Sequence, residues 1–255
     1  MDSNLAEANR EQARFLAPCR LVEQDDVLFT ASGTRCPGGP FNSVIGIADS
    51  CPDPASTLGV ARAFYTELGR GFTVYVRAHL DAPLAEACER GGLVRMADAP
   101  GMVLFGRVPG LAPGPSIEIR TIDDAAAAPA FVDVVSAAYP TIGLPAEVTR
   151  KVFSMPERWL APHMHYLVLF DHDQPAAAVM LHFSHQVAGV YWVGTAPEAR
   201  GKGHATVLMS HASNLAFDHG ARAVILQATP YGEPVYKKLG YREVTRYPWY
   251  LAARV

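Results

Sequence analysis

The chain has 255 residues, of which 49% are hydrophobic and 18% are charged, and its formal net charge is −3. This composition supports one or two folded domains and excludes a disordered chain. It also lacks the runs of basic residues that usually form the electropositive face of a nucleic-acid-binding protein.

The four cysteines, Cys19, Cys36, Cys51 and Cys88, are scattered without CxxC spacing. They predict reduced thiols rather than disulfides or a zinc site. The first residues are polar, unlike a signal peptide, and no apolar run approaches the roughly 20 residues of a membrane span. We therefore expect a soluble, cytoplasmic protein that binds neither membranes nor nucleic acid.

The first half of the chain alternates short apolar runs with helical patterns. Residues 105–116 then contain three Pro and three Gly and are interpreted as a linker between domains at 1–110 and 111–255. Before the linker, strands are predicted at 42–47, 72–76, 93–96 and 102–105, and helices at 58–68 and 83–90.

The second half continues the alternation, and its clearest element is a helix at 203–218 with one apolar stripe, which Gly220 ends. An apolar run just after it, at 223–228, is typical of a buried strand. The other predicted strands lie at 117–122, 166–170, 175–184, 187–195, 241–245 and 249–252, and the other helices at 123–139, 145–153 and 233–239.

Two stretches of equal length, 87–104 and 235–252, suggest an internal repeat. In their alignment Gly92 falls on Gly240, and Pro100 falls on Pro248. Cys88 then takes the place of Tyr236. We interpret the chain as two related lobes.

The segment Arg200-Gly201-Lys202-Gly203-His204-Ala205 joins a predicted strand to a predicted helix. The first amides of a helix have no internal partner, the helix dipole is positive there, and glycine permits close approach, so this turn can bind phosphate. Gly203 follows the Lys where a Walker loop needs Ser or Thr, and a complete dinucleotide fingerprint is missing. The ligand that remains as a candidate is a diphosphate that backbone amides hold without a metal.

This segment resembles motif A of the GNAT superfamily, the Gcn5-related N-acetyltransferases, whose pattern R/Q-x-x-G-x-G/A is filled by Arg200, Gly203 and Ala205. Residues 228–244 resemble the family's motif B, with Tyr236 on its tyrosine and Leu239-Gly240-Tyr241 on its LGF/Y sequence. The resemblance covers about the last 140 residues. It implies an α/β (α+β) fold with a mixed central sheet and helices on both faces.

The resemblance also implies a site for acetyl-CoA as co-substrate, without a metal. The diphosphate is expected on the amides of Arg200, Gly201, Lys202, Gly203, His204 and Ala205, and the pantetheine arm on the main chain of Val193 and Thr195. The amide of Val193 is expected to stabilise the oxyanion, and Tyr236 to protonate the CoA thiolate.

Two positions depart from the family pattern. Thr229 stands where many members have an Asn, so its contact with CoA or the helix is in doubt. The strand at 187–193 lacks the Glu that serves many members as general base, which leaves His182, His185, Glu233 or a water chain as alternatives. His163 and His165 share one face of a strand, but two His without a third ligand are usually polar surface.

These features favour an N-acyltransferase whose partners are an acyl-CoA and a primary amine, small molecule or protein, joined in a ternary complex. A homodimer is left open. A catalytically silent acyl-CoA-binding or regulatory protein is the alternative, and a scaffold protein is the third hypothesis.

The N-terminal lobe has neither the glycine loop nor the tyrosine, since its first helix follows ADSCPDPAST at 48–57. We expect it to be a degenerate GNAT-like half that binds no CoA.

Overall fold

The computed structural model describes residues 1–37 and 39–253, which form two compact units. The C-terminal unit comprises Met102–Arg242 together with Met1, and the N-terminal unit comprises Asp2–Gly101 and the described residues from Glu243 onward. None of the helices in the described ranges combines the length and the apolar character that a membrane crossing requires.

The C-terminal unit is a mixed sheet whose strands run in the order β10-β9-β8-β7-β6, with the last residues of β5 beside β10. Neighbours β6 to β9 are antiparallel, whereas β9 and β10 are parallel. Its strands are β6 (Ile117–Ile122), β7 (Met164–Asp171), β8 (Gln174–Ser184), β9 (Val187–Thr195) and β10 (Val224–Gln227). Its helices are α4 (Ala128–Ala138), α5 (Ala146–Val152), α6 (His204–Asp218) and α7 (Glu233–Lys238), with 3-10 turns η2 (Tyr139–Ile142), η3 (Pro156–Leu160) and η4 (Pro197–Ala199).

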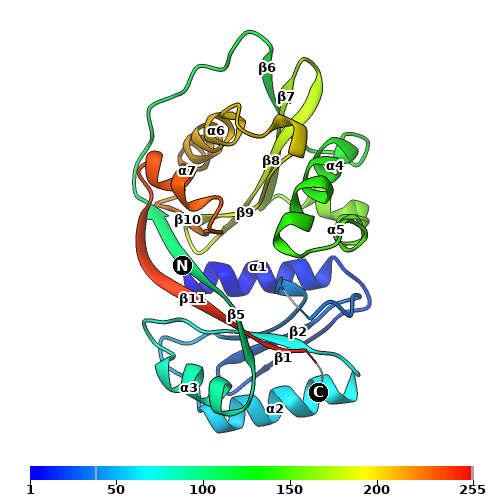
Figure 1. The fold of residues 1–255 in the computed structure, drawn as a ribbon, viewed down its shortest axis with the longest axis vertical. Helices are drawn as coiled ribbons and strands as arrows, with labels where there is room; N and C mark the ends of the chain where they lie inside the picture. Colours follow the sequence, from blue (N-terminus) through cyan, green and yellow to red (C-terminus); the bar gives the residue numbers. More distant parts are fainter. Residues whose placement is uncertain (38, 254–255) are drawn as a thin grey trace. The chain divides into compact units, whose positions relative to one another are not determined.

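Helices cover both faces of this sheet, α6 and α7 on one and α4 and α5 on the other (Figure 1). The side chains of each strand alternate between the two faces. Leu167 and Leu169 of β7 share a core with the apolar stripe of α6, whereas Tyr166, the residue just before them on the strand, packs its ring on Phe131 of α4. The predicted mixed sheet with helices on both faces is therefore confirmed.

The N-terminal unit repeats this plan with strands in the order β1-β2-β3-β4-β11-β5. Helix α1 lies on one face of its sheet, and α2 and α3 lie on the other (Figure 1). Its elements are α1 (Asp2–Arg14), β1 (Arg20–Gln24), β2 (Val27–Ala31), the 3-10 turn η1 (Gly39–Phe41), β3 (Asn42–Gly46), α2 (Pro54–Glu67), β4 (Phe72–Tyr75) and α3 (Ala82–Arg90). The sequence patterns predicted neither α1 nor the hairpin of β1 and β2.

Two long strands, β5 (Val94–Leu104) and β11 (Arg242–Ala252), complete the sheet of the N-terminal unit, and only the last residues of β5 and the first residue of β11 belong to the C-terminal unit. The prediction of two short strands in each of these regions was wrong, because Pro100 and Pro248 do not interrupt them. The carbonyl of Pro248 still accepts a hydrogen bond from the Val76 amide (3.0 Å). Both strands have eleven residues with Pro at the seventh, as the proposed repeat requires.

Residues 105–116 contain no helix or strand. The change from one compact unit to the other falls earlier, between Gly101 and Met102 inside β5, and β11 packs with the N-terminal unit. The division into a degenerate lobe at 1–110 and a catalytic domain at 111–255 stays a prediction.

A buried ion pair anchors the loop between β4 and α3 in the N-terminal unit. Arg77 and Asp81 are 1% and 0% exposed, and the Arg77 Nε lies 2.7 Å from the Asp81 carboxylate. The guanidinium also donates to the carbonyls of Ala48 and Ser50, at 2.5 and 2.9 Å. The pair therefore ties this loop to the segment that follows β3.

Asp81→Ala should lower the free energy of unfolding by about 3–5 kcal/mol, because it leaves a buried guanidinium without its counterion. The matched control is Glu86→Ala, which breaks the exposed pair of Glu86 with Arg90 in the same unit and at the same four-residue spacing. That change should cost less than about 1 kcal/mol. Urea unfolding of both variants measures the difference, and equal losses would contradict the prediction.

Candidate active site

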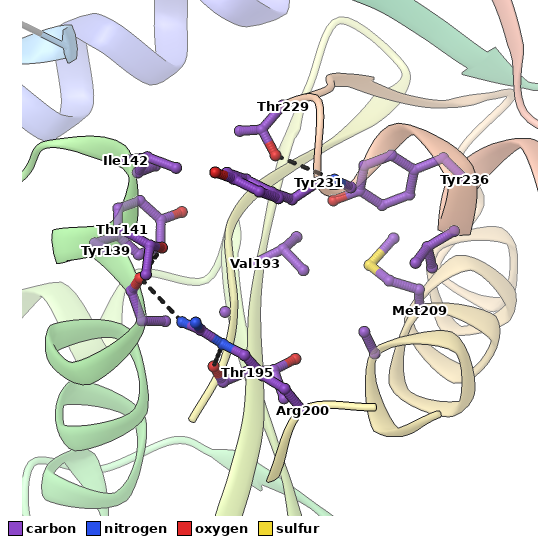
Figure 2. A pocket seen from close by; sticks show the side chains of 15 residues that line it. Tyr139, Thr141, Ile142, Val193, Thr195, Arg200, Met209, Thr229, Tyr231 and Tyr236 are labelled. Carbon is purple, nitrogen blue, oxygen red and sulfur yellow. Dashed lines mark hydrogen bonds between the residues drawn. The ribbon is translucent and has the colours of Figure 1, made fainter. Parts of the chain in front are cut away.

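A cavity of about 360 Å³ opens in the C-terminal unit. It lies between the end of β9, the start of α6 and the start of α7, and η2 closes it opposite α7 (Figure 2). The residues that line it are Ala138, Tyr139, Thr141, Ile142, Val193, Gly194, Thr195, Arg200, Ala205, Met209, Thr229, Tyr231, Gly232, Val235 and Tyr236. It thus brings together Val193, Thr195, Arg200, Ala205, Thr229 and Tyr236 from the predicted site.

Strand β9 leaves its parallel neighbour before it reaches the cavity. Over the described residues, the register that pairs β10 with β9 joins Val224 to Ala188 and Ile225 to Gly189 and goes no further. The end of β9, which carries Val193 and Thr195, therefore has backbone groups that β10 does not engage on the cavity side.

A β-bulge marks the point of divergence. The pairing of β8 with β9 shifts between Ala178 and Met180, so that Trp192 and Val193 both lie opposite Val179. Trp192 has a φ of 53°, a left-handed conformation that costs a bulky residue about 1–3 kcal/mol. Its ring is held against Tyr139 and Phe153, with centroids 4.7 and 4.9 Å apart.

The glycine turn presents free amides at the start of α6. Gly201 and Gly203 have φ values of 78° and 84°, which glycine adopts without strain. Among the described residues, the amides of 201–205 have no hydrogen-bond acceptor, and the first amides bonded into the helix are those of Thr206 and Val207. These donors fit a diphosphate, because the positive end of the helix dipole lies at the same place.

The side chains of this turn point in different directions. Arg200 lies on the cavity wall, where it donates to the carbonyls of Thr195 (3.3 Å) and Ala138 (3.5 Å). His204 is buried, with Nε2 3.2 Å from the carboxylate of Asp171 at the end of β7. The side chain of His204 thus faces away from the cavity, and only its amide can serve a ligand there. Gly201, Lys202 and Gly203 are exposed and lie outside the cavity lining.

Tyr236 reaches the cavity from α7 on the side opposite Tyr139 (Figure 2). It is 6% exposed, and burial raises the pKa of its phenol, which is therefore protonated at neutral pH. Thr229 fixes the start of α7, since its carbonyl accepts from the amides of Gly232 and Glu233, both at 3.0 Å. The Thr229 hydroxyl also accepts from the Gly232 amide (3.2 Å), so Thr229 holds the α7 end of the cavity with both its backbone and its side chain.

Residues 129–241 match the model of the acetyltransferase (GNAT) family. The chain contains a GNAT acetyltransferase domain. No curated protein matches the sequence.

Solved structures extend the similarity to the whole chain. A GCN5-related N-acetyltransferase from Kribbella flavida is 15% identical, with a TM-score of 0.75 over 98% of this chain and 95% of its own. One from Sphaerobacter thermophilus is 15% identical, with a TM-score of 0.65 over 99% and 90%. A tandem GNAT protein of the clavulanic acid biosynthesis pathway is 15% identical, with a TM-score of 0.62 over 96% and 87%. At these identities the matches establish the shared fold.

None of the three side chains considered as general base lines the cavity of the GNAT domain. His182 is fully buried within β8, and His185 is exposed in the turn that follows β8. Glu233 forms an ion pair with Lys237 (2.6 Å). The described residues of the cavity wall therefore include no carboxylate or imidazole that could act as a base.

His163 and His165 contact other histidines, His182 and His219 respectively, with ring centroids 5.4 and 4.6 Å apart. In the described part of the chain, no three His, Cys, Asp or Glu side chains form a group that could hold a metal ion. These pairs are ring contacts.

The sequence motifs predicted some of the residues that line the cavity but did not mark others. Tyr139, Thr141 and Ile142 also line the cavity, but no motif in the sequence marks them. Met209 was assigned only to the apolar stripe of α6, and it lines the cavity as well. A long side chain near the first turn of that helix was the one available signal.

The N-terminal unit differs at the two equivalent positions. Its helix α2 is capped by the Asp53 carboxylate, which accepts from the Ser56 amide (2.6 Å) where α6 has its glycine turn. Cys88, at the place of Tyr236, is fully buried, and burial raises the pKa of its thiol to about 12. A carboxylate already occupies the end of this helix, and the thiol is protonated and enclosed.

His182 gives the GNAT domain a specific pH dependence. Burial, and then the nearby His163 and His185, lower its pKa to about 4, so the folded state holds it neutral. The unfolded chain takes up a proton near pH 6.5. Stability should therefore fall as the pH drops from about 6.5 to 4, by at most about 1.4 kcal/mol per pH unit from this residue.

Urea unfolding of the wild type and of His182→Gln at pH 7, 6, 5 and 4 tests this assignment. The variant should show a shallower loss of stability over this range, whereas His185→Gln, in the exposed turn, should follow the wild type. Parallel profiles for all three proteins would show that His182 is not the titrating group.

Proposed function

We propose that this protein is an acyl-CoA-dependent N-acyltransferase that transfers acetyl from acetyl-CoA to a primary amine. One observation carries the proposal: Arg200 and Ala205, at the two ends of the glycine turn, line the same cavity as Val193 and Tyr236. A turn with free amides, a strand end that β10 does not pair with and a buried phenol thus lie within reach of one extended substrate.

Acetyl-CoA supplies the acetyl group as an activated thioester. The amides of residues 201–205 hold its diphosphate, and Arg200 adds positive charge at the cavity wall. The end of β9, which β10 does not engage, offers the main chain of Val193 and Thr195 to the pantetheine amides. These two contacts fix the thioester between β9 and α7.

The amine attacks the thioester carbonyl directly in a ternary complex. The Val193 amide stabilises the charge that develops on the carbonyl oxygen. Tyr236 donates its proton to the departing sulfur, which its raised pKa permits because the phenol is protonated at the pH of reaction. No cysteine lines the cavity, so the wall offers no thiol for a covalent acyl-enzyme.

The absence of a carboxylate and of His from the cavity lining favours a second candidate, a protein that binds acyl-CoA without turnover. The buried phenol of Tyr236 supports the enzyme instead. The tandem GNAT protein matches this chain over 96% of its length, which supports an N-terminal lobe of GNAT ancestry. Asp53 at the start of α2 supports a single CoA site per chain.

Gly203→Glu should abolish acetyl-CoA binding, because it places a carboxylate where the diphosphate binds. The matched control is Gly220→Glu at the other end of α6, where φ is 82° and, as at Gly203, nothing lies near the added Cβ. Both changes impose a similar backbone strain of about 1–2 kcal/mol.

Isothermal titration should give one equivalent of acetyl-CoA for the wild type and for Gly220→Glu. Gly203→Glu should bind at least about a hundredfold more weakly, which is about 2.7 kcal/mol. Two equal sites per chain would contradict the single-site assignment, and equal affinities in both variants would exclude the glycine turn as the site.

Tyr236→Phe should lower kcat by about 10²–10⁴-fold and leave the Kd for acetyl-CoA within about threefold, because the phenol acts on the leaving sulfur. Val235→Ala, a neighbour that also lines the cavity but lacks a proton to give, is the control and should keep kcat within about tenfold. Steady-state kinetics with titration of acetyl-CoA measures both quantities. An unchanged kcat in Tyr236→Phe would remove Tyr236 from the reaction.

A further inference from the structure

Among the described residues that line the cavity, only one side chain is charged at neutral pH. That side chain belongs to Arg200, one of the fifteen residues of the lining. Arg200 stands at the end of the glycine turn and is bonded to the carbonyls of Thr195 and Ala138. Its charge therefore belongs to the part of the cavity that faces the diphosphate, and the rest of the wall is apolar or carries hydroxyls.

Such a wall suits a neutral acceptor better than an ammonium ion. A buried cation needs a counterion, and the acid next to the cavity, Glu233, is already paired with Lys237. An amine as basic as a lysine side chain is neutral in only about one molecule in 2500 at pH 7. With no carboxylate or histidine on the wall to remove its proton, such an amine reacts only through this minor form.

Two large hydrophobic side chains lie exposed on this same wall. Tyr231 is 76% exposed and Ile142 is 46% exposed, and both line the cavity. They come from the loop before α7 and from η2, and Figure 2 shows Tyr231 extending toward Ile142 above Val193. Exposed apolar side chains beside a cavity are typical of a ligand-binding surface.

Tyr231 and Ile142 form an apolar rim on a cavity wall whose one charge, among the described residues, belongs to Arg200. From these two features we infer that the acceptor is an aromatic amine, with an uncharged nitrogen, and that Tyr231 and Ile142 select its ring. This inference rests on the proposed function and narrows the acceptor from primary amines in general to one chemical class.

Such an acceptor balances the protons of the reaction without a separate base. The neutral nitrogen forms the C–N bond to the acetyl carbon, and the C–S bond of the thioester breaks. Tyr236 gives its proton to sulfur, and the proton that nitrogen loses on becoming an amide restores the phenol. The products are the N-acetylated amine and CoA with its thiol, and Tyr236 ends as it began.

The first experiment compares aniline with benzylamine, which share a phenyl ring and differ in basicity. The products, acetanilide and N-benzylacetamide, are quantified by chromatography from pH 6.5 to 8.5, with acetyl-CoA binding titrated in parallel. At pH 7, kcat/KM for aniline should exceed that for benzylamine at least tenfold and change little with pH. The value for benzylamine should rise about tenfold per pH unit.

The second experiment tests the rim. Tyr231→Ser should raise KM for aniline at least fivefold and leave kcat within twofold, because Tyr231 holds the ring and takes no part in proton transfer. The matched control is Phe105→Ser, an aromatic residue of the same unit that is 73% exposed and lies outside the cavity lining. It should leave both constants unchanged.

The outcomes separate the two levels of the proposal. If acetyl-CoA binds but benzylamine is the better acceptor at pH 7, or neither amine is acetylated, the acceptor class is wrong while the CoA site stands. If Tyr231→Ser and Phe105→Ser behave alike, the rim does not select the ring. If acetyl-CoA does not bind at all, the proposed function fails, and this inference fails with it.

Discussion

The separation of β9 from β10 is the constraint on which the candidate site depends. Two parallel strands that stayed paired to their ends would leave no backbone groups for a substrate and no space between α6 and α7. The bulge at Trp192 and Val193 accompanies the separation, and the left-handed φ of Trp192 is maintained because its ring packs between Tyr139 and Phe153. The rings of η2 and of the segment after α5 therefore stabilise a strained backbone next to the cavity. The same Tyr139 lines the cavity, so the ring that supports the bulge also shapes the cavity wall.

The two units show how one arrangement of strand and helix can carry opposite electrostatics. Both α2 and α6 follow a strand of their sheet, and both expose amides at their first turn. In the N-terminal unit the Asp53 side chain satisfies one of these donors, which stabilises the helix by about 1 kcal/mol and fills the site with negative charge. In α6 the position before the helix is Gly203, which has no side chain to cap it, so the donors remain free for an external anion. The start of α6 thus lacks the stabilisation that a capping side chain gives, and its amides are free to bind a ligand.

The sequence predicted elements best where one local signal decided them. Helix α6, β6 and β9 were placed within about a residue because apolar periodicity and flanking glycines agreed there. The prediction of two short strands in each region was wrong for β5 and β11, since Pro100 and Pro248 lie inside continuous strands and the Pro248 carbonyl still accepts a hydrogen bond. Helix α1 was missed because polar residues such as Asn4, Asn9 and Gln12 are among those it buries, which removes the apolar stripe. The motif residues of the site follow from local sequence, whereas Tyr139, Ile142 and the Trp192 bulge depend on packing between elements far apart in the chain.

The charge of the whole cavity explains why its wall carries no general base. A general base beside a thioester must itself be neutralised or solvated, and a carboxylate there would also repel a phosphate-bearing substrate. The cavity wall avoids both costs because hydroxyls and apolar groups surround Val193, and the positive charge of Arg200 is confined to the end near the glycine turn. In such a wall the phenol of Tyr236, protonated because burial raises its pKa, can both give a proton and take one back within a single turnover. Under the proposed function, the acceptor rather than the protein must then provide a nitrogen that is already uncharged.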